Sequence, residues 1–156
     1  MKKITLILAA ATFALSAPTW TLAAMDHGGM NMDHGAMKGG VAHEEVVEGV
    51  KATFKVTTMK EAMKEMNMEM PKGVKETHHI SVSFTDAKTG KPLTDGQVKM
   101  KVMGPDKGEQ TKEMMGMHGH FGADFDLAKK GKYGVMSKFI LKDGKTRSAK
   151  FWYTVK

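Results

Sequence analysis

The chain contains no cysteine among its 156 residues. Disulfide bonds, thiolate metal sites, a lipid anchor on cysteine and cysteine catalysis are therefore excluded. Arginine is nearly absent too, because Arg147 is the only copy. The net charge of +7 consequently comes from dispersed lysines, without the arginine clusters typical of a nucleic-acid surface. We expect no nucleic-acid partner.

The motifs of common enzyme classes are also missing. Ser81, Ser83 and Ser137 fall in predicted strands, without a His/Asp partner in a neighbouring loop. The sequence has no glycine-rich phosphate loop and no HExxH motif. We therefore expect a protein that is not an enzyme.

Residues 1–24 have the pattern of a secretory signal peptide. A basic start precedes an apolar run from Ile4 to Leu15, and small residues lead to a cleavage site near Ala23 or Ala24. The run is too short for a permanent membrane anchor, and no later segment qualifies as one. We expect export to a periplasm, where methionine is a suitable soft ligand because thiols there oxidise or pair.

Sixteen methionines and seven histidines are the unusual part of the composition. The heptad Met-Asp-His-Gly-x-Met-Asn/Lys occurs at residues 25–31 and again at 32–38. Thioether sulfur selects Cu(I), and imidazole accepts both copper oxidation states. The heptads therefore predict a copper site, with Cu(I) preferred and Cu(II) as an alternative. The predicted ligands there are Met25, His27, Met30, Met32, His34 and Met37.

A polar leader without metal is the alternative reading of the heptads, but the repetition favours metal binding. The repeat resembles the Met/Asp/His-rich segments of periplasmic copper-resistance proteins.

The position of the cleavage site affects copper chemistry. Cleavage after Ala24 makes His27 the third residue, so that the free amine, two amides and the imidazole can form a square-planar Cu(II) site. Cleavage after Ala23 moves His27 to fourth place and removes this chelate. Both cleavage positions remain open.

Apolar and polar residues alternate through the second part of the chain, which predicts half-buried strands. The expected strands are residues 49–58, 77–86, 97–103, 109–115, 120–127, 133–141 and the C-terminal segment. Short strands at this spacing, separated by turn residues, are typical of an immunoglobulin-like antiparallel β-sandwich. We therefore expect an all-β sandwich of about seven strands at residues 46–156, preceded by a flexible metal-binding tail at residues 25–45.

Residues 59–70 break this alternation. Methionines at positions 59, 63, 66 and 70 follow the period of an amphipathic helix, which predicts a short Met-rich helical insert. Read as an extended chain, Met66, Met68 and Met70 instead present three thioethers on one side. We expect them to help hold copper; the alternative is that they only pack against the sheet.

A second group of soft ligands lies within the predicted sandwich. Two histidines begin the strand at residues 77–86, and residues 114–120 surround a tight turn. Strand ends and turns collect at the ends of a sandwich, so these groups are expected to meet. The candidate ligands are His78, His79, Met114, Met115, Met117, His118 and His120. Loss of His79 or Met117 should be most visible, with His78 replacing His79 if the strand register differs. A surface histidine pair beside a partly buried turn is the alternative.

The same region resembles a known family. The residues that carry the resemblance are HISVSFTDAKTGKPL at 79–93, Val98–Val102, Gly-Lys-Tyr at 131–133 and the closing F-x-Y-T-V at 151–155. This pattern resembles YtkA-like domains, exported β-sandwiches related to the FixH type. Some members of that group are encoded beside copper or cytochrome-oxidase genes, so the resemblance implies an association with copper.

These observations predict a periplasmic copper-binding protein that acts as a chaperone, buffer or resistance factor. Its expected partners are the copper ion and a periplasmic copper acceptor or efflux protein. One alternative is an exported interaction or assembly module in which methionine only packs. The other is a Met-based silver-binding or oxidant-scavenging protein.

Overall fold

The structure is a computed structural model that describes residues 40–156. The predicted signal peptide and the heptad ligands Met25 to Met37 lie outside the described residues, so they stay predictions.

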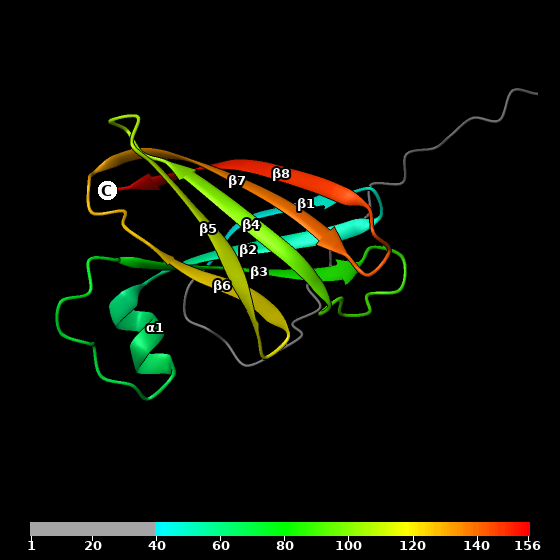
Figure 1. Cartoon of the computed structure of the whole chain (residues 1–156), viewed down its shortest axis with the longest axis horizontal. Helices are drawn as coiled ribbons and strands as arrows, with labels where there is room; N and C mark the ends of the chain where they lie inside the picture. The colour runs from blue at the N-terminus through cyan, green and yellow to red at the C-terminus, as the bar shows by residue number, and fades with distance from the viewer. Residues whose placement is uncertain (1–39) are drawn as a thin grey trace, which may run out of the picture. The chain divides into compact units, whose positions relative to one another are not determined.

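The described residues form eight antiparallel strands and one short helix, α1 (Met59–Glu65). The strands are β1 (Val41–Val47), β2 (Val50–Thr58), β3 (His78–Asp86), β4 (Gly96–Met103), β5 (Glu109–Met117), β6 (His120–Phe125), β7 (Gly131–Leu141) and β8 (Thr146–Val155). They are joined in the order β1-β2-β3-β6-β5-β4-β7-β8. The first part of β5 pairs with β4 and its end pairs with β6, so the sheet folds over into two facing layers (Figure 1). The predicted all-β sandwich is confirmed.

The core follows from the alternation seen in the sequence. Phe54 on β2, Val82 on β3 and Met100 on β4 are each 0% exposed, and their neighbours along each strand lie on the opposite face of the sheet. Burial of one such side chain contributes about 1.5–3 kcal/mol. Because the period is two residues, this core also determines which polar side chains lie on the outer faces.

Strand β1 was not expected from the sequence. The sequence pattern predicts that residues 41–45 belong to the tail, whereas the structure pairs this segment with β2. A shift in register between Val41 and His43 interrupts the alternation that would have revealed the strand. The His43 ring stacks on Phe151 at 5.0 Å, which brings β1 against β8.

Helix α1 begins at a capping box and is shorter than predicted. The Thr58 side chain accepts a hydrogen bond from the Glu61 backbone, and the Glu61 carboxylate accepts one from the Thr58 backbone. The helix ends because Asn67 has a φ of 54°, which cannot continue a right-handed helix. The prediction of helix through residue 70 was therefore wrong beyond the cap at Met66. No helix in residues 40–156 is long and apolar enough to cross a membrane.

An ion pair between a buried arginine and an exposed aspartate joins two turns. Arg147 on β8 is 5% exposed and donates two hydrogen bonds to Asp143, at 3.0 and 2.6 Å. It also donates to the Glu48 carbonyl in the β1–β2 turn. The Arg147 guanidinium lowers the pKa of Asp143 to about 2.

Replacement of Asp143 by Asn should therefore destabilise the protein in a pH-dependent way. The folded-state pKa of Asp143 lies below its ordinary value of 3.8, so its stabilising effect is present above pH 4 and is lost as the pH falls toward 2. Urea unfolding across this range should show the midpoint of Asp143→Asn below that of the wild type at pH 5, with the gap closing near pH 2. A gap that stays constant with pH would contradict this account.

Candidate metal centre

A tight turn positions the Met/His-rich stretch. His118 and Gly119 have φ values of 44° and 85°, so both turn residues are left-handed, as in a type I′ hairpin. Residues 116 and 117, expected in the turn, belong to β5, and Met117 pairs directly with His120 on β6. These two ligand candidates are therefore held by paired strands rather than by a loop.

The two adjacent histidines of β3 face opposite sides of the sheet. Ile80 and Val82 lie in the core, so the period of two places His79 on the outer face and His78 on the inner one. The His78 ring lies 6.4 Å from Tyr153 in an edge-on arrangement. Its Nδ1 is 2.8 Å from the Thr77 hydroxyl, and burial lowers its pKa, with the charge of Glu61 opposing the effect.

His79 is held in one orientation by two residues of β6. Its Nδ1 lies 2.7 Å from Asp124 Oδ1, an arrangement in which Nδ1–H donates to the carboxylate and leaves the Nε2 lone pair free. The ring edge rests on Gly122, where an added methyl group would lie 2.7 Å from His79 Nε2. Gly122 thus provides the space that the ring occupies.

Met117 and His120 lie on the same face of the sheet as this ring, because they pair with each other across β5 and β6, and His120 precedes Gly122 by two residues. The same methyl position at Gly122 is 3.5 Å from Met117 Cε, so the His79 ring and the end of the Met117 side chain both approach Gly122. His120 Nε2 is buried and has no hydrogen-bond partner. Burial lowers the pKa of His120, and the charge of neighbouring His79 lowers it further. Both effects favour the neutral imidazole, which is the form that binds metal.

The cluster of His79, His120 and Met117 therefore offers two imidazoles and one thioether. This donor set suits Cu(I), whereas hard cations such as Mg²⁺ and Ca²⁺ require several oxygen ligands. Across residues 40–156, no group of three or more His, Asp or Glu side chains is placed to hold a metal ion. Any metal at this cluster would therefore depend on the thioether.

The remaining candidates lie elsewhere. Met114 is 7% exposed and packs in the core, so its thioether faces away from the cluster. Met115 is opposite Gly122 but 72% exposed, and His118 is exposed at the turn. Met66, Met68 and Met70 follow α1 and are exposed.

Two residues of the cluster were missed in the sequence. Gly122 and Asp124 follow His120 at intervals of two along β6, so the alternation of that strand already placed all three on one face. The missing information was the pairing of His79 with Asp124 across β3 and β6, which joins residues 45 positions apart.

Comparison with known proteins shows the fold and not the family. No family model matches the chain, and no curated protein matches it. A copper-bound variant of FetP from uropathogenic Escherichia coli superposes with a TM-score of 0.58 at 11% identity, over 73% of this chain and 89% of that one. A copper-bound variant of P19 from Campylobacter jejuni gives 0.55 at 10% identity, covering 74% and 96%. A DUF4426 family protein from Pseudomonas aeruginosa gives 0.53 at 11% identity, covering 72% and 93%.

Replacement of Gly122 by Ala should displace the His79 ring. The added methyl would lie 2.7 Å from two ring atoms, so the ring must move and its hydrogen bond to Asp124 should be lost. Histidine ¹⁵N NMR reports this as loss of the fixed Nδ1–H tautomer. Gly116→Ala is the matched control, because its methyl would meet the Phe121 ring at an ordinary 3.6 Å. An unchanged His79 spectrum in Gly122→Ala would refute the arrangement.

Proposed function

We propose that this chain is an exported copper-binding protein that holds Cu(I) at the His79–His120–Met117 cluster. The observation that carries the proposal is the convergence at Gly122 of an oriented imidazole and a thioether, beside a buried imidazole nitrogen without a partner. A buried polar atom without a hydrogen bond is costly, and a metal ion would satisfy it.

The surrounding residues suit this role. Asp124 fixes the His79 tautomer, as carboxylates commonly do for histidines that bind metals. Among the described residues, Asp124 is the only carboxylate hydrogen-bonded to the cluster, and its bond is to His79 Nδ1. The proposed metal ligands are then two imidazoles and one thioether, a soft donor set that favours Cu(I) over harder ions. The copper-bound FetP and P19 variants share the fold, which supports the proposal at the level of architecture.

The wider role remains part of the same proposal. The heptads at residues 25–38 would capture copper in the periplasm, and the cluster on the sandwich would hold or relay it to an acceptor or efflux protein. A chaperone, buffer or resistance factor fits this scheme, because thioether ligands hold Cu(I) without a full thiolate cage. Membership of the YtkA-like or FixH-like group belongs to this proposal too.

Cu(I) competition against a chromophoric chelator tests the cluster. A chain starting at Gly40 omits both heptads and should still compete for Cu(I). His79→Gln and His120→Gln should each weaken its affinity by about tenfold or more. His78→Gln is the matched control, because His78 adjoins His79 in sequence but faces the other side of the sheet, and its affinity should be unchanged.

Two outcomes would reject the proposal. A folded chain starting at Gly40 that does not compete for Cu(I) would exclude a copper site on the sandwich. Equal losses in His78→Gln and His79→Gln would exclude the specific cluster.

A further inference from the structure

The C-terminal end of α1 turns back on itself in a defined way. Asn67 N–H donates to the Lys64 carbonyl at 3.3 Å, and Met68 N–H donates to the Met63 carbonyl at 2.9 Å. Together with the left-handed φ of 54° at Asn67, these bonds form a Schellman motif with Met66 as its cap. The motif fixes the backbone of Met68 beside that of Met63.

This reversal changes which methionines belong together. The Schellman motif commonly brings the side chain at the position of Met68 against the one at the position of Met63. Beyond Met68 the chain is neither helix nor strand, and Met70 follows two residues later. The turn therefore separates Met66 from Met68, and the structure favours the pair Met63 and Met68, with Met70 two residues further on, over the M-x-M-x-M row read from the sequence.

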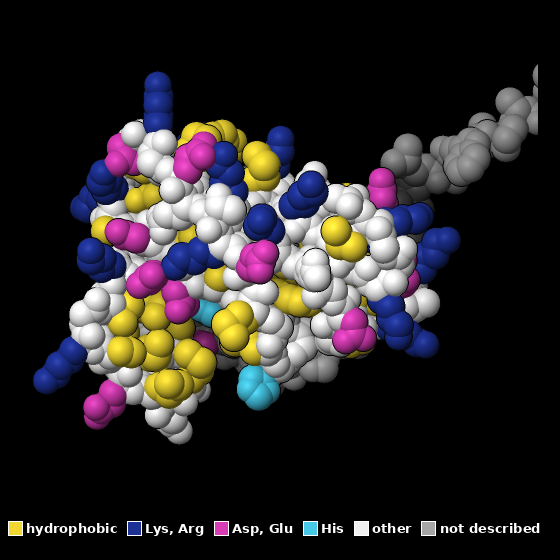
Figure 2. Space-filling model, in the orientation of Figure 1, with side chains coloured by type: hydrophobic (Ala, Val, Ile, Leu, Met, Phe, Trp, Pro, Cys, Tyr) yellow, Lys and Arg dark blue, Asp and Glu magenta, His cyan; other side chains and the backbone are white. Residues whose placement is uncertain are grey.

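These thioethers face solvent instead of filling the core. Met68 is 56% exposed and Met70 is 46% exposed, and Met63 is partly buried. Methionines that pack the core behave differently, because Met59 is 2% exposed and Met100 is 0% exposed. A space-filling view shows apolar side chains gathered over the region of α1 (Figure 2). Packing among residues 40–156 therefore does not account for the exposed thioethers.

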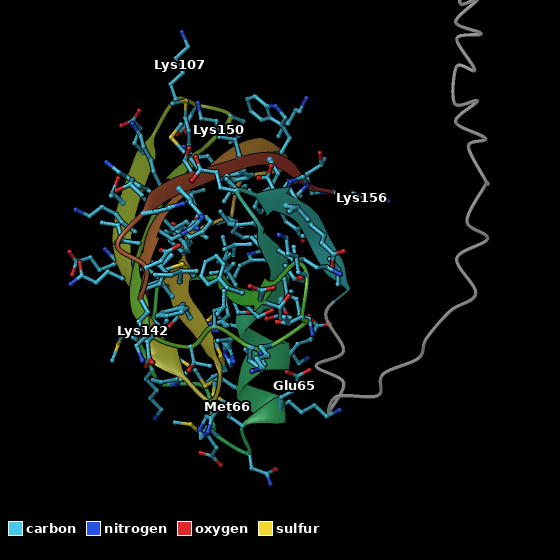
Figure 3. The ribbon with its side chains drawn as sticks, turned by 90° about the vertical axis from the view of Figure 1, so that its right-hand side faces the viewer. Glu65, Met66, Lys107, Lys142, Lys150 and Lys156 are labelled. Carbon is cyan, nitrogen blue, oxygen red and sulfur yellow. The ribbon has the colours of Figure 1, made fainter. Side chains whose placement is uncertain are left out.

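We propose that Met63, Met68 and Met70 form a second binding site, made of thioethers alone, for a soft monovalent ion such as Cu(I) or Ag(I). Three neutral sulfurs are a suitable donor set for such an ion and a poor one for Cu(II), Zn²⁺ or hard cations. The end of α1, marked by Glu65 and Met66, lies at the opposite end of the described domain from Lys107 and Lys150 (Figure 3). Both charges occur near the three methionines, because Lys64 and Glu65 end α1 and Glu69 precedes Met70. The inference rests on the proposed function for the identity of the ion, but it does not require the His79 cluster.

Titration of the full chain with Ag(I), a redox-stable probe of thioether sites, tests this site. In ¹³C-methyl methionine NMR spectra, the Met63, Met68 and Met70 methyl signals should shift together at the same Ag(I) ratio. Met103 and Met136 serve as internal controls, because they are 39% and 40% exposed on the other layer and should not follow. The site would be overturned if the methyl signals of Met63, Met68 and Met70 shift no more than those of Met103 and Met136.

Variants separate this site from the cluster. Replacement of Met63, Met68 and Met70 by Leu should remove the Ag(I)-induced methyl shifts at the α1 end, while the shift of the Met117 methyl signal remains. The matched control variant, Met103→Leu with Met136→Leu, should retain the Ag(I)-induced methyl shifts both at the α1 end and at Met117. Loss of the α1 shifts in His79→Gln, with the three methionines intact, would overturn an independent site.

Asn67 allows a test that removes no ligand. Asn67→Gly keeps the left-handed turn, whereas Asn67→Val is strained at this φ and should open it. We expect Ag(I) affinity at the α1 site to be retained in Asn67→Gly and to fall about tenfold in Asn67→Val, as for other residues that orient ligands. Equal affinity in the two variants, with unchanged circular dichroism, would contradict the role of the turn.

Discussion

The two-residue period of β3 and β6 determines which side chains of these strands share a face, and so which residues form the proposed cluster. Burial of Ile80 and Val82 on β3, and of Phe121 and Phe125 on β6, leaves the intervening residues on the opposite face. A slip of one residue in either strand would expose these apolar side chains, so the register is strongly fixed. The same burial that stabilises the sandwich therefore places His79 beside Gly122 and Asp124, and excludes His78 from the cluster.

This arrangement has consequences for metal chemistry. Ligands on paired strands hold their geometry better than ligands in a loop, and Asp124 orients His79 from the neighbouring strand. The methionines after α1 represent the opposite case, because their position depends on one turn at Asn67 and they face solvent. The proposed exposed thioether site after α1 would allow an ion to be captured, and the proposed cluster of two imidazoles and one thioether would hold it.

Much of the fold was predictable, because alternation reports burial within a single strand. It identified the segments that form β2 to β8 and the inward positions Phe54 and Met100. It failed for β1, where the irregular register at His43 breaks the period. The proposed cluster includes His79 and Met117, which residue chemistry also suggests, but the orientation of Met114 and the positions of Gly122 and Asp124 depend on pairings between distant segments. Local patterns do not contain those pairings.

Histidine ¹⁵N NMR during addition of one equivalent of Cu(I) tests the central claim most directly. The measurement resolves each imidazole nitrogen, so it separates the two faces of β3 within one protein. The account predicts that the Nε2 signals of His79 and His120 shift together, with the His79 Nδ1–H signal retained through Asp124 and the His78 signals unchanged. A shift at His78, or the absence of a shift at both His79 and His120, would contradict it.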